Sequence, residues 1–191
     1  MKNKKNDIQP IGCTESSEVA FHLDVFDRLY NGNIIITKRL TNNLIDKLVE
    51  HKDKIILHFT VTGFGGSVLE PFVPPLEISR KKFGQLLDRG FPIDHCVLRI
   101  DPCIPTEKGL ETMCKVVESV SDTGIKRVRF SVLDMYDHVK KRFNESGIEL
   151  PYETFHAPLE DRKKMYDVLC ELGEKYGFTV EVCAEPGIES I

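Results

Sequence analysis

Hydrophobic positions along the chain follow two alternating periods, which predict short strands separated by helices. The strand-like runs are rich in β-branched residues and occupy residues 33–38, 55–63, 96–101, 127–133 and 179–184, with a weaker run at 8–12. Between them, apolar residues recur at helical spacing, as in Leu44, Ile45 and Leu48 behind a capping Thr41. The other predicted helices occupy residues 76–89, 108–123, 136–145 and 159–176.

This alternation predicts an α/β fold, because a strand, a helix and a second strand normally form a right-handed crossover between parallel strands. An open doubly wound sheet and a barrel both satisfy the pattern. The sequence contains neither a G-x-G-x-x-G fingerprint nor a P-loop, which disfavours the nucleotide-binding sheets. About six strand–helix units are too few for a complete eight-unit barrel. We therefore predict a partial (β/α)6 TIM-like barrel that forms a single domain over residues 1–191.

The composition changes this picture only by excluding classes of protein. The 191 residues include 26 Lys and Arg and 30 Asp and Glu, for a formal net charge of −4. No apolar run approaches the ~18 residues of a membrane-spanning helix, and the basic start lacks the apolar region of a secretory signal. We therefore expect a cytoplasmic protein without membrane contact. An acidic chain has no general attraction for nucleic acid, and only the basic patch of Lys140, Lys141 and Arg142 offers weak support for such contact.

Polar residues collect where the predicted strands end, which is where parallel α/β folds place their chemistry. Side chains two positions apart share one face of a strand, so Arg99 lies beside Asp101 and Glu181 beside Cys183. The candidates at these strand ends are Thr60, Thr62, Glu70, Arg99, Asp101, Arg129, Ser131, Asp134, Glu181, Cys183 and Glu185. A structural ion pair is the ordinary explanation for any one strand. Four strands with the same pattern predict one shared cavity, because unpaired charge is costly to bury.

The predicted cavity suits a small polar ligand. Arg99 can hold a carboxylate or phosphate, whereas Asp101 and Glu185 can accept hydrogen bonds from hydroxyl groups or an amine. If the barrel is an acid–base enzyme, Asp101, Asp134 and Glu185 are its candidate catalytic carboxylates. The glycines at 65 and 66 either allow close approach to a ligand or belong to a flexible connection.

Six cysteines are scattered along the chain, at positions 13, 96, 103, 114, 170 and 183. No two of them have the two-residue spacing of a CxxC pair. Without a secretory signal, such cysteines are expected to be reduced thiols. Cys114 and Cys170 fall on predicted helices and are expected to pack as small apolar residues.

Three segments together resemble a known family: TVTGFGGSVLEPFVPP, VLRIDPCIPTEKGL and IKRVRFSVLDMYDHVKKRF. They are similar to the radical SAM proteins related to spore photoproduct lyase, and in particular to bacterial and phage members of that group. The resemblance extends over most of residues 33–185. It implies a partial (β/α)6 barrel, S-adenosylmethionine as a cofactor, and activity on a nucleic-acid base or a small metabolite.

Members of this family hold a [4Fe–4S] cluster with a CxxxCxxC motif after the first strand, and the cluster binds S-adenosylmethionine. Here the same spacing contains Cys13, Ser17 and Ala20. One thiolate cannot hold a four-iron cluster, so the resemblance implies the cluster only if positions 17 and 20 are cysteines in the native protein. The change is either natural, as in a pseudoenzyme, or engineered.

By the same resemblance, later strand ends contact S-adenosylmethionine, and Arg99, Asp101 and Ser131 are the residues implied. The glycine–glycine–glutamate motif for the amino group of this cofactor is absent in its usual form. Together with the other cavity candidates, the proposed cofactor-binding set is Thr62, Gly65, Gly66, Glu70, Arg99, Ser131 and Cys183.

Three functions are compatible with the sequence. The first is a radical-SAM-like barrel that binds S-adenosylmethionine or a related nucleoside without cluster chemistry. The second is a non-catalytic protein that uses the barrel as a scaffold for binding a partner. The third is an isomerase, lyase or hydrolase in which strand-end carboxylates converge.

Overall fold

The computed structural model describes residues 9–11, 18–29, 32–183 and 185–189. At its centre is one sheet of six parallel strands, in which each strand pairs with its neighbours in the sequence. The strands are β1 (Gln9–Ile11), β2 (Asn33–Thr37), β3 (Ile55–Thr60), β4 (Cys96–Cys103), β5 (Arg127–Val132) and β6 (Thr179–Val182). The six strands predicted from the sequence are therefore present.

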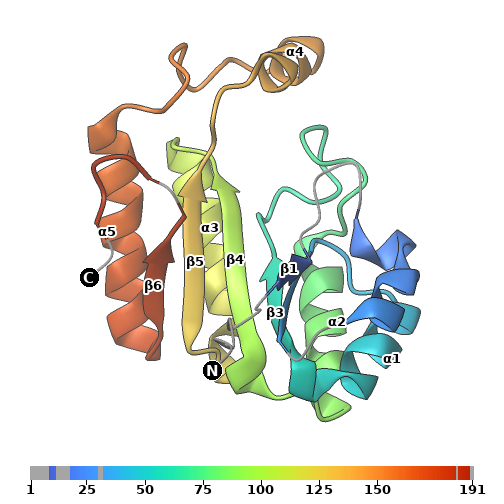
Figure 1. Cartoon of the computed structure of the whole chain (residues 1–191). Coiled ribbons are helices and arrows are strands. Elements are labelled where there is room, and N and C mark those ends of the chain that lie inside the picture. The colour runs from blue at the N-terminus through green and yellow to red at the C-terminus, as the bar shows by residue number, and fades with distance from the viewer. Residues whose placement is uncertain (1–8, 12–17, 30–31, 184, 190–191) are drawn as a thin grey trace, which may run out of the picture.

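Helices cover one face of this sheet, as Figure 1 shows. They are α1 (Asn42–Glu50), α2 (Leu76–Asp88), α3 (Glu107–Val120), α4 (Asp137–Glu145) and α5 (Leu159–Tyr176). Four of them lie beside the strands, whereas α4 lies beyond the carboxyl ends of the strands. The prediction of a partial α/β barrel is confirmed. Within the described residues, none of the helices combines the length and apolar character needed to cross a membrane.

Two local details differ from the expected repeat. The described part of the connection between β1 and β2 contains two short 3₁₀ helices, Val19–Phe21 and Leu23–Arg28, in place of an α-helix. Strand β4 also continues through Pro102 to Cys103, two residues beyond the predicted end at Asp101. The strand tolerates a residue without an N–H because the pairing register with β5 shifts between Ile100 and Cys103.

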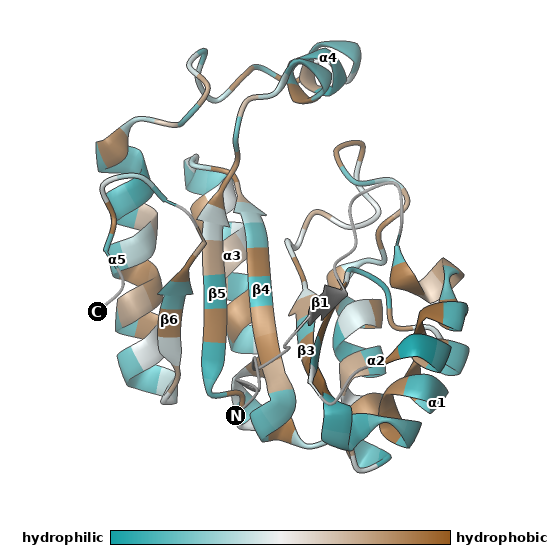
Figure 2. Cartoon of the chain, viewed as in Figure 1, coloured by the Kyte–Doolittle hydropathy of each residue, from teal (hydrophilic) through white to brown (hydrophobic). Residues whose placement is uncertain are grey.

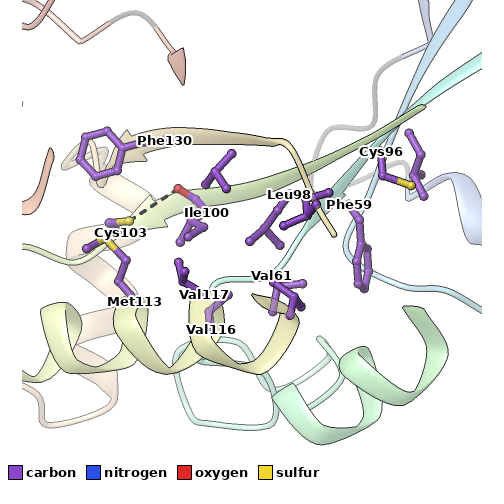
Figure 3. Packing of buried hydrophobic residues seen from close by; sticks show 14 of the residues in the cluster. Phe59, Val61, Cys96, Leu98, Ile100, Cys103, Met113, Val116, Val117 and Phe130 are labelled. Atoms are coloured by element: carbon purple, nitrogen blue, oxygen red, sulfur yellow. Dashed lines mark hydrogen bonds between the residues drawn. The ribbon is translucent and has the colours of Figure 1, made fainter. Parts of the chain in front are cut away.

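The side chains that face the helices are apolar and form the core. Leu98 and Ile100 of β4 lie opposite Val116 and Val117 of α3, as Figure 3 shows. On β3, Phe59 stacks on Phe83 of α2, with 5.7 Å between the ring centroids. Full burial of a Leu, Ile or Phe side chain stabilises the fold by about 1.5–3 kcal/mol. The alternation of these residues along the strands therefore fixes which face meets the helices.

The opposite face of the sheet, called the inner face below, is polar over β3 to β6. Register pairs join Thr60 to Arg99, Arg99 to Arg129, and Arg129 to Glu181. Because partners in register point to the same side of a sheet, these four side chains form a row across the inner face. Figure 2 shows hydrophilic bands alternating with hydrophobic ones along β4 and β5. The sheet thus separates an apolar outer layer from a charged inner surface.

Candidate functional site

A cavity of about 840 Å³ opens at the carboxyl ends of β2, β3 and β4. Its polar lining residues are Glu18, Thr37, Lys38, Arg39, Thr60, Glu70, Arg99, Asp101 and Arg142. Its apolar lining includes Phe21, Ile36, Phe72 and Val73. A site with this position and mixed lining is typical of ligand binding in parallel α/β folds.

Glu70 lies at the centre of the polar network. One carboxylate oxygen lies 2.5 Å from Nζ of Lys38, and the other accepts a hydrogen bond from the hydroxyl group of Thr62. The side chains of Lys38 and Glu70 are 25% and 13% exposed, so the pair is screened from bulk water but still reaches the cavity. This arrangement leaves a cation and an anion at one wall of the cavity.

Glu18 connects the start of the first 3₁₀ helix to the part of the cavity wall that contains Lys38. Its Oε2 accepts the backbone N–H of Lys38 at 2.9 Å, and its Oε1 accepts the hydroxyl group of Thr37. These bonds attach the segment before the first 3₁₀ helix to the carboxyl end of β2. The carboxylate therefore both shapes the cavity and lines it.

Arg99 and Asp101 form another part of the wall, and both project from the inner face of β4. Nε of Arg99 donates to Oδ2 of Asp101 at 2.8 Å, and Nη2 donates to the same oxygen. Within the described residues, Oδ1 of Asp101 has no hydrogen-bond donor, which leaves it available to a ligand. Nη2 of Arg99 also lies 3.8 Å from Sγ of Cys183, so Cys183 contacts this wall.

Two strongly exposed phenylalanines stand at the rim. Phe21 is 68% exposed and Phe72 is 84% exposed. Arg39 lies between their segments: its guanidinium carbon is 5.4 Å from the ring centroid of Phe21, and its Nη2 donates to the backbone oxygen of Phe72. Exposed aromatic rings beside a polar cavity provide stacking surfaces for a planar ligand.

The glycine-containing loop after β3 forms another part of the wall. A Cβ atom at Gly65 would lie 2.0 Å from the carbonyl oxygen of Pro74, so only glycine fits against this part of the chain. Gly66 has a φ of 76° and donates its N–H to the carbonyl oxygen of Glu70 at 3.0 Å. The two glycines thus shape the loop that carries Glu70 and Phe72.

Ser131 and Glu185 meet each other, but neither lines the cavity. Oε1 of Glu185 accepts from the hydroxyl of Ser131 at 2.9 Å and from the N–H of Val132 at 2.7 Å. Nη1 of Arg162 lies 3.4 Å from Oε2 in a pair that is almost fully buried. This geometry fits a structural lock that joins α5 and the segment after β6 to β5.

Asp134 belongs to a third group, which lies after β5. Its Oδ1 lies 2.8 Å from Nδ1 of His156, and both side chains are partly exposed. The three carboxylates proposed for acid–base catalysis therefore have separate partners: Arg99 for Asp101, His156 for Asp134, and Arg162 for Glu185. A catalytic role for each of them stays a prediction.

The positions that would carry the iron–sulfur cluster do not fit that group. Cys13 and Ser17 lie outside the described residues. Ala20 is described, and its methyl side chain has no atom that can bind iron, while its N–H donates to Glu18 at 3.3 Å. Elsewhere in the described part of the chain, no three His, Cys, Asp or Glu side chains are grouped so that they could hold a metal ion.

Several cavity residues were not among the sequence candidates. Thr37 and Lys38 end the predicted strand at 33–38, so the strand-end rule applied to them as much as to Arg99. Glu18, Phe21 and Phe72 lie in connections whose path no local pattern specifies.

The fold is similar to solved structures of spore photoproduct lyase. A cysteine-to-serine variant of that enzyme has a TM-score of 0.69 and 12% identity, covering 94% of this chain and 63% of that chain. A cysteine-to-alanine variant with dinucleoside spore photoproduct has a TM-score of 0.68 at the same identity and coverage. A double variant with bound AdoMet and dinucleoside spore photoproduct has a TM-score of 0.61 and 13% identity, with coverages of 91% and 60%. At such identity the likeness concerns the fold alone.

The chain therefore spans less than two thirds of the length of those lyases. No curated protein matches its sequence. Residues 33–190 match the family described as a domain of unknown function, DUF1848. This match covers β2 to β6 and most of the cavity lining, and the chain belongs to the DUF1848 family.

Proposed function

We propose that this radical-SAM-like barrel binds S-adenosylmethionine or a related nucleoside in the cavity at its carboxyl edge, without holding a [4Fe–4S] cluster as written. The observation that carries the proposal is the 840 Å³ cavity, in which charged groups of both signs and exposed aromatic rings converge. The volume lies in the range of about 300–1,000 Å³ that is usual for small-molecule sites.

The lining offers a partner for each part of such a ligand. Glu70 and Asp101 can accept from an ammonium group or from ribose hydroxyls, and Lys38 and Arg99 can bind a carboxylate. Phe21 or Phe72 can stack on a purine ring. The spore photoproduct lyase structure with bound AdoMet supports this choice, because a barrel of this shape accommodates that molecule.

The open cavity favours ligand binding over a scaffold that serves only to bind a partner protein. The acid–base alternative has less support, because its candidate carboxylates engage different partners. Cluster-dependent chemistry would need thiolates that positions 17 and 20 do not provide.

Calorimetric titration of the full chain with S-adenosylmethionine, S-adenosylhomocysteine and adenosine tests the proposal. At least one of the three is expected to bind. Phe72→Ala should weaken binding roughly 5- to 30-fold through loss of stacking worth about 1–2 kcal/mol. Because Phe72 is 84% exposed, its removal should leave folding intact.

The matched control is Val68→Ala, which truncates another exposed apolar side chain of the same loop outside this cavity. It should leave the affinity unchanged. The absence of binding for all three ligands at millimolar concentration, or equal loss in both variants, would contradict the proposal.

A further inference from the structure

The inner face of the sheet carries more positive than negative charge below the cavity. Arg99, Arg127 and Arg129 alternate with Asp101 and Glu181 on the inner face of β4, β5 and β6. Arg99 pairs with Asp101, and Nε of Arg127 lies 2.7 Å from Glu181. Asp101 and Glu181 are therefore each paired with an arginine, and neither of them pairs with Arg129.

Arg129 forms no ion pair in the described part of the chain, because its register partner Glu181 pairs with Arg127 instead. No Asp or Glu oxygen there lies within 4.0 Å of its guanidinium group, and its Nε is buried without a hydrogen-bond acceptor. Arg129 as a whole is partly exposed, but its buried Nε has lost water and gained no acceptor, which is unfavourable. An acceptor oxygen of an anion would satisfy this nitrogen.

His58 provides a second orphaned group on the same face. It lies two residues before Thr60, so strand alternation places both side chains on the inner face. The side chain is 3% exposed, and its Nδ1 is buried without a partner. Burial is the largest cause that lowers the pKa of His58 to about 4, and the positive charge of Arg129 is the next. The ring is therefore neutral at pH 7. A neutral ring can carry its single proton on Nδ1 and donate it.

We propose that Arg129 and His58 form an anion-binding subsite beneath the cavity, which takes one phosphate or carboxylate group. Thr60 and Arg99 line the floor of the cavity, and Arg129 is the register partner of Arg99. Neither Arg129 nor His58 lines the cavity itself, so the anion would pass Thr60 and Arg99 to contact Nε of Arg129 and Nδ1 of His58. Where the anion is a group of the ligand that fills the cavity, the inference rests on the proposed function.

The first experiment measures thermal unfolding of the full chain in sodium phosphate against sodium chloride at equal ionic strength. Phosphate at ten times its Kd should raise Tm by about 3–6 °C, because it binds only the folded state. Arg129→Gln should abolish this rise. In chloride alone the variant should melt no lower than the parent chain, because it removes an uncompensated charge.

Lys126→Gln is the matched control, because it removes one positive charge from an exposed position three residues earlier. It should keep the full response to phosphate. An equal phosphate response in Arg129→Gln and Lys126→Gln would overturn the subsite. If Arg129→Gln fails to fold, the phosphorus NMR signal of phosphate must still broaden when the unaltered protein is added, and no broadening would also overturn it.

The second experiment identifies the source of the anion by titrating adenosine and adenosine monophosphate. At least tenfold tighter binding of the monophosphate, lost in Arg129→Gln, assigns the subsite to the ligand of the cavity. Stabilisation by phosphate without this preference supports a site for a free anion. Stabilisation by phosphate when no nucleoside binds would reject the proposed function and retain the subsite.

Discussion

Glu185 and His58 are both buried, but their surroundings neutralise the cost of burial in different ways. Glu185 lies against the guanidinium group of Arg162 and accepts two further hydrogen bonds. His58 lies among arginines and is neutral instead, because its pKa is about 4. Each side chain therefore makes a separate prediction about stability.

Arg162→Met should destabilise the protein by about 3–5 kcal/mol, because it leaves the carboxylate of Glu185 buried without its counter-charge. It also removes the donors to the carbonyl oxygens of Ala157 and Pro186. Urea denaturation measures the change. The double variant Arg162→Met with Glu185→Met should recover part of the loss. A cost below about 1 kcal/mol for the single variant would mean that the pair is not a structural lock.

His58 should make the protein less stable as the pH falls from 6.5 towards 4. In this window the unfolded chain binds a proton at His58 and the folded chain does not, since the folded pKa lies below the ordinary histidine pKa of 6.5. The loss amounts to roughly 3 kcal/mol over the whole window. Chemical denaturation of the parent chain and His58→Leu across this range checks it. Their stability profiles should diverge on acidification, and parallel profiles would refute the assignment.

Some residues of the site were predictable and others were not, for a physical reason. Arg99 and Asp101 were candidates because they lie at the end of a predicted strand, Glu70 because it follows one, and all three line the cavity. Ser131 and Glu185 satisfied the same pattern but bind each other, and Glu185 also pairs with Arg162, which is too distant in sequence for the contact to be predicted. Strand ends are visible in a sequence, whereas the partners that the crossovers bring to them are not.

At the scale of elements, glycines have opposite roles in the loop after β3 and in α2. Gly65 packs against the backbone of Pro74 with no room for a side chain. Gly84 lies inside α2, and a Cβ there would meet only the flexible end of Arg80 at 3.2 Å. The same substitution should therefore have opposite effects at the two positions.

Gly84→Ala should stabilise the chain by about 0.5–1 kcal/mol, since alanine restricts the unfolded chain and favours the helix. Gly65→Ala should destabilise it and weaken ligand binding, because the loop that carries Glu70 and Phe72 must shift. Thermal unfolding and calorimetric titration of the two variants measure both effects. Equal behaviour of the two variants would contradict the role assigned to the loop.

Element boundaries were predictable wherever a local signal marks them. Thr41 caps α1 by accepting the N–H of Leu44 at 3.1 Å, as its position before an amphipathic stretch indicated. The extension of β4 beyond Pro102 was not predictable, because the register shift that permits it depends on β5. The boundaries of helices and strands can therefore be predicted where they depend on interactions between residues that are close in sequence.

At the scale of the whole molecule, the order of elements was enough to predict the barrel. Parallel strands joined by right-handed crossovers can follow one another in only a few arrangements. The arrangement of polar groups on the inner face does not follow from this order alone, since they come from β3, β4, β5 and β6 together. The combination of a predictable scaffold and an unpredictable lining is what separates fold from function here.

The complete chain should take up no stoichiometric [4Fe–4S] cluster when it is reconstituted anaerobically with iron and sulfide. Cys13 is the one cysteine among the three motif positions, and a four-iron cluster normally needs three or more thiolates. Absorption spectroscopy with iron and sulfide analysis measures uptake, and a radical SAM enzyme with all three cysteines is the positive control. Stoichiometric uptake by this chain would show that other side chains supply the ligands.

The strand order of the sheet also has a consequence for how the protein is made. Each strand from β2 onward pairs with the strand that precedes it in the sequence. During synthesis, every new strand therefore finds its neighbour already outside the ribosome, and the sheet can grow from one edge in the direction of translation. The lock between Ser131, Arg162 and Glu185 joins β5, α5 and the segment after β6, so it can form only once residue 185 has been synthesised.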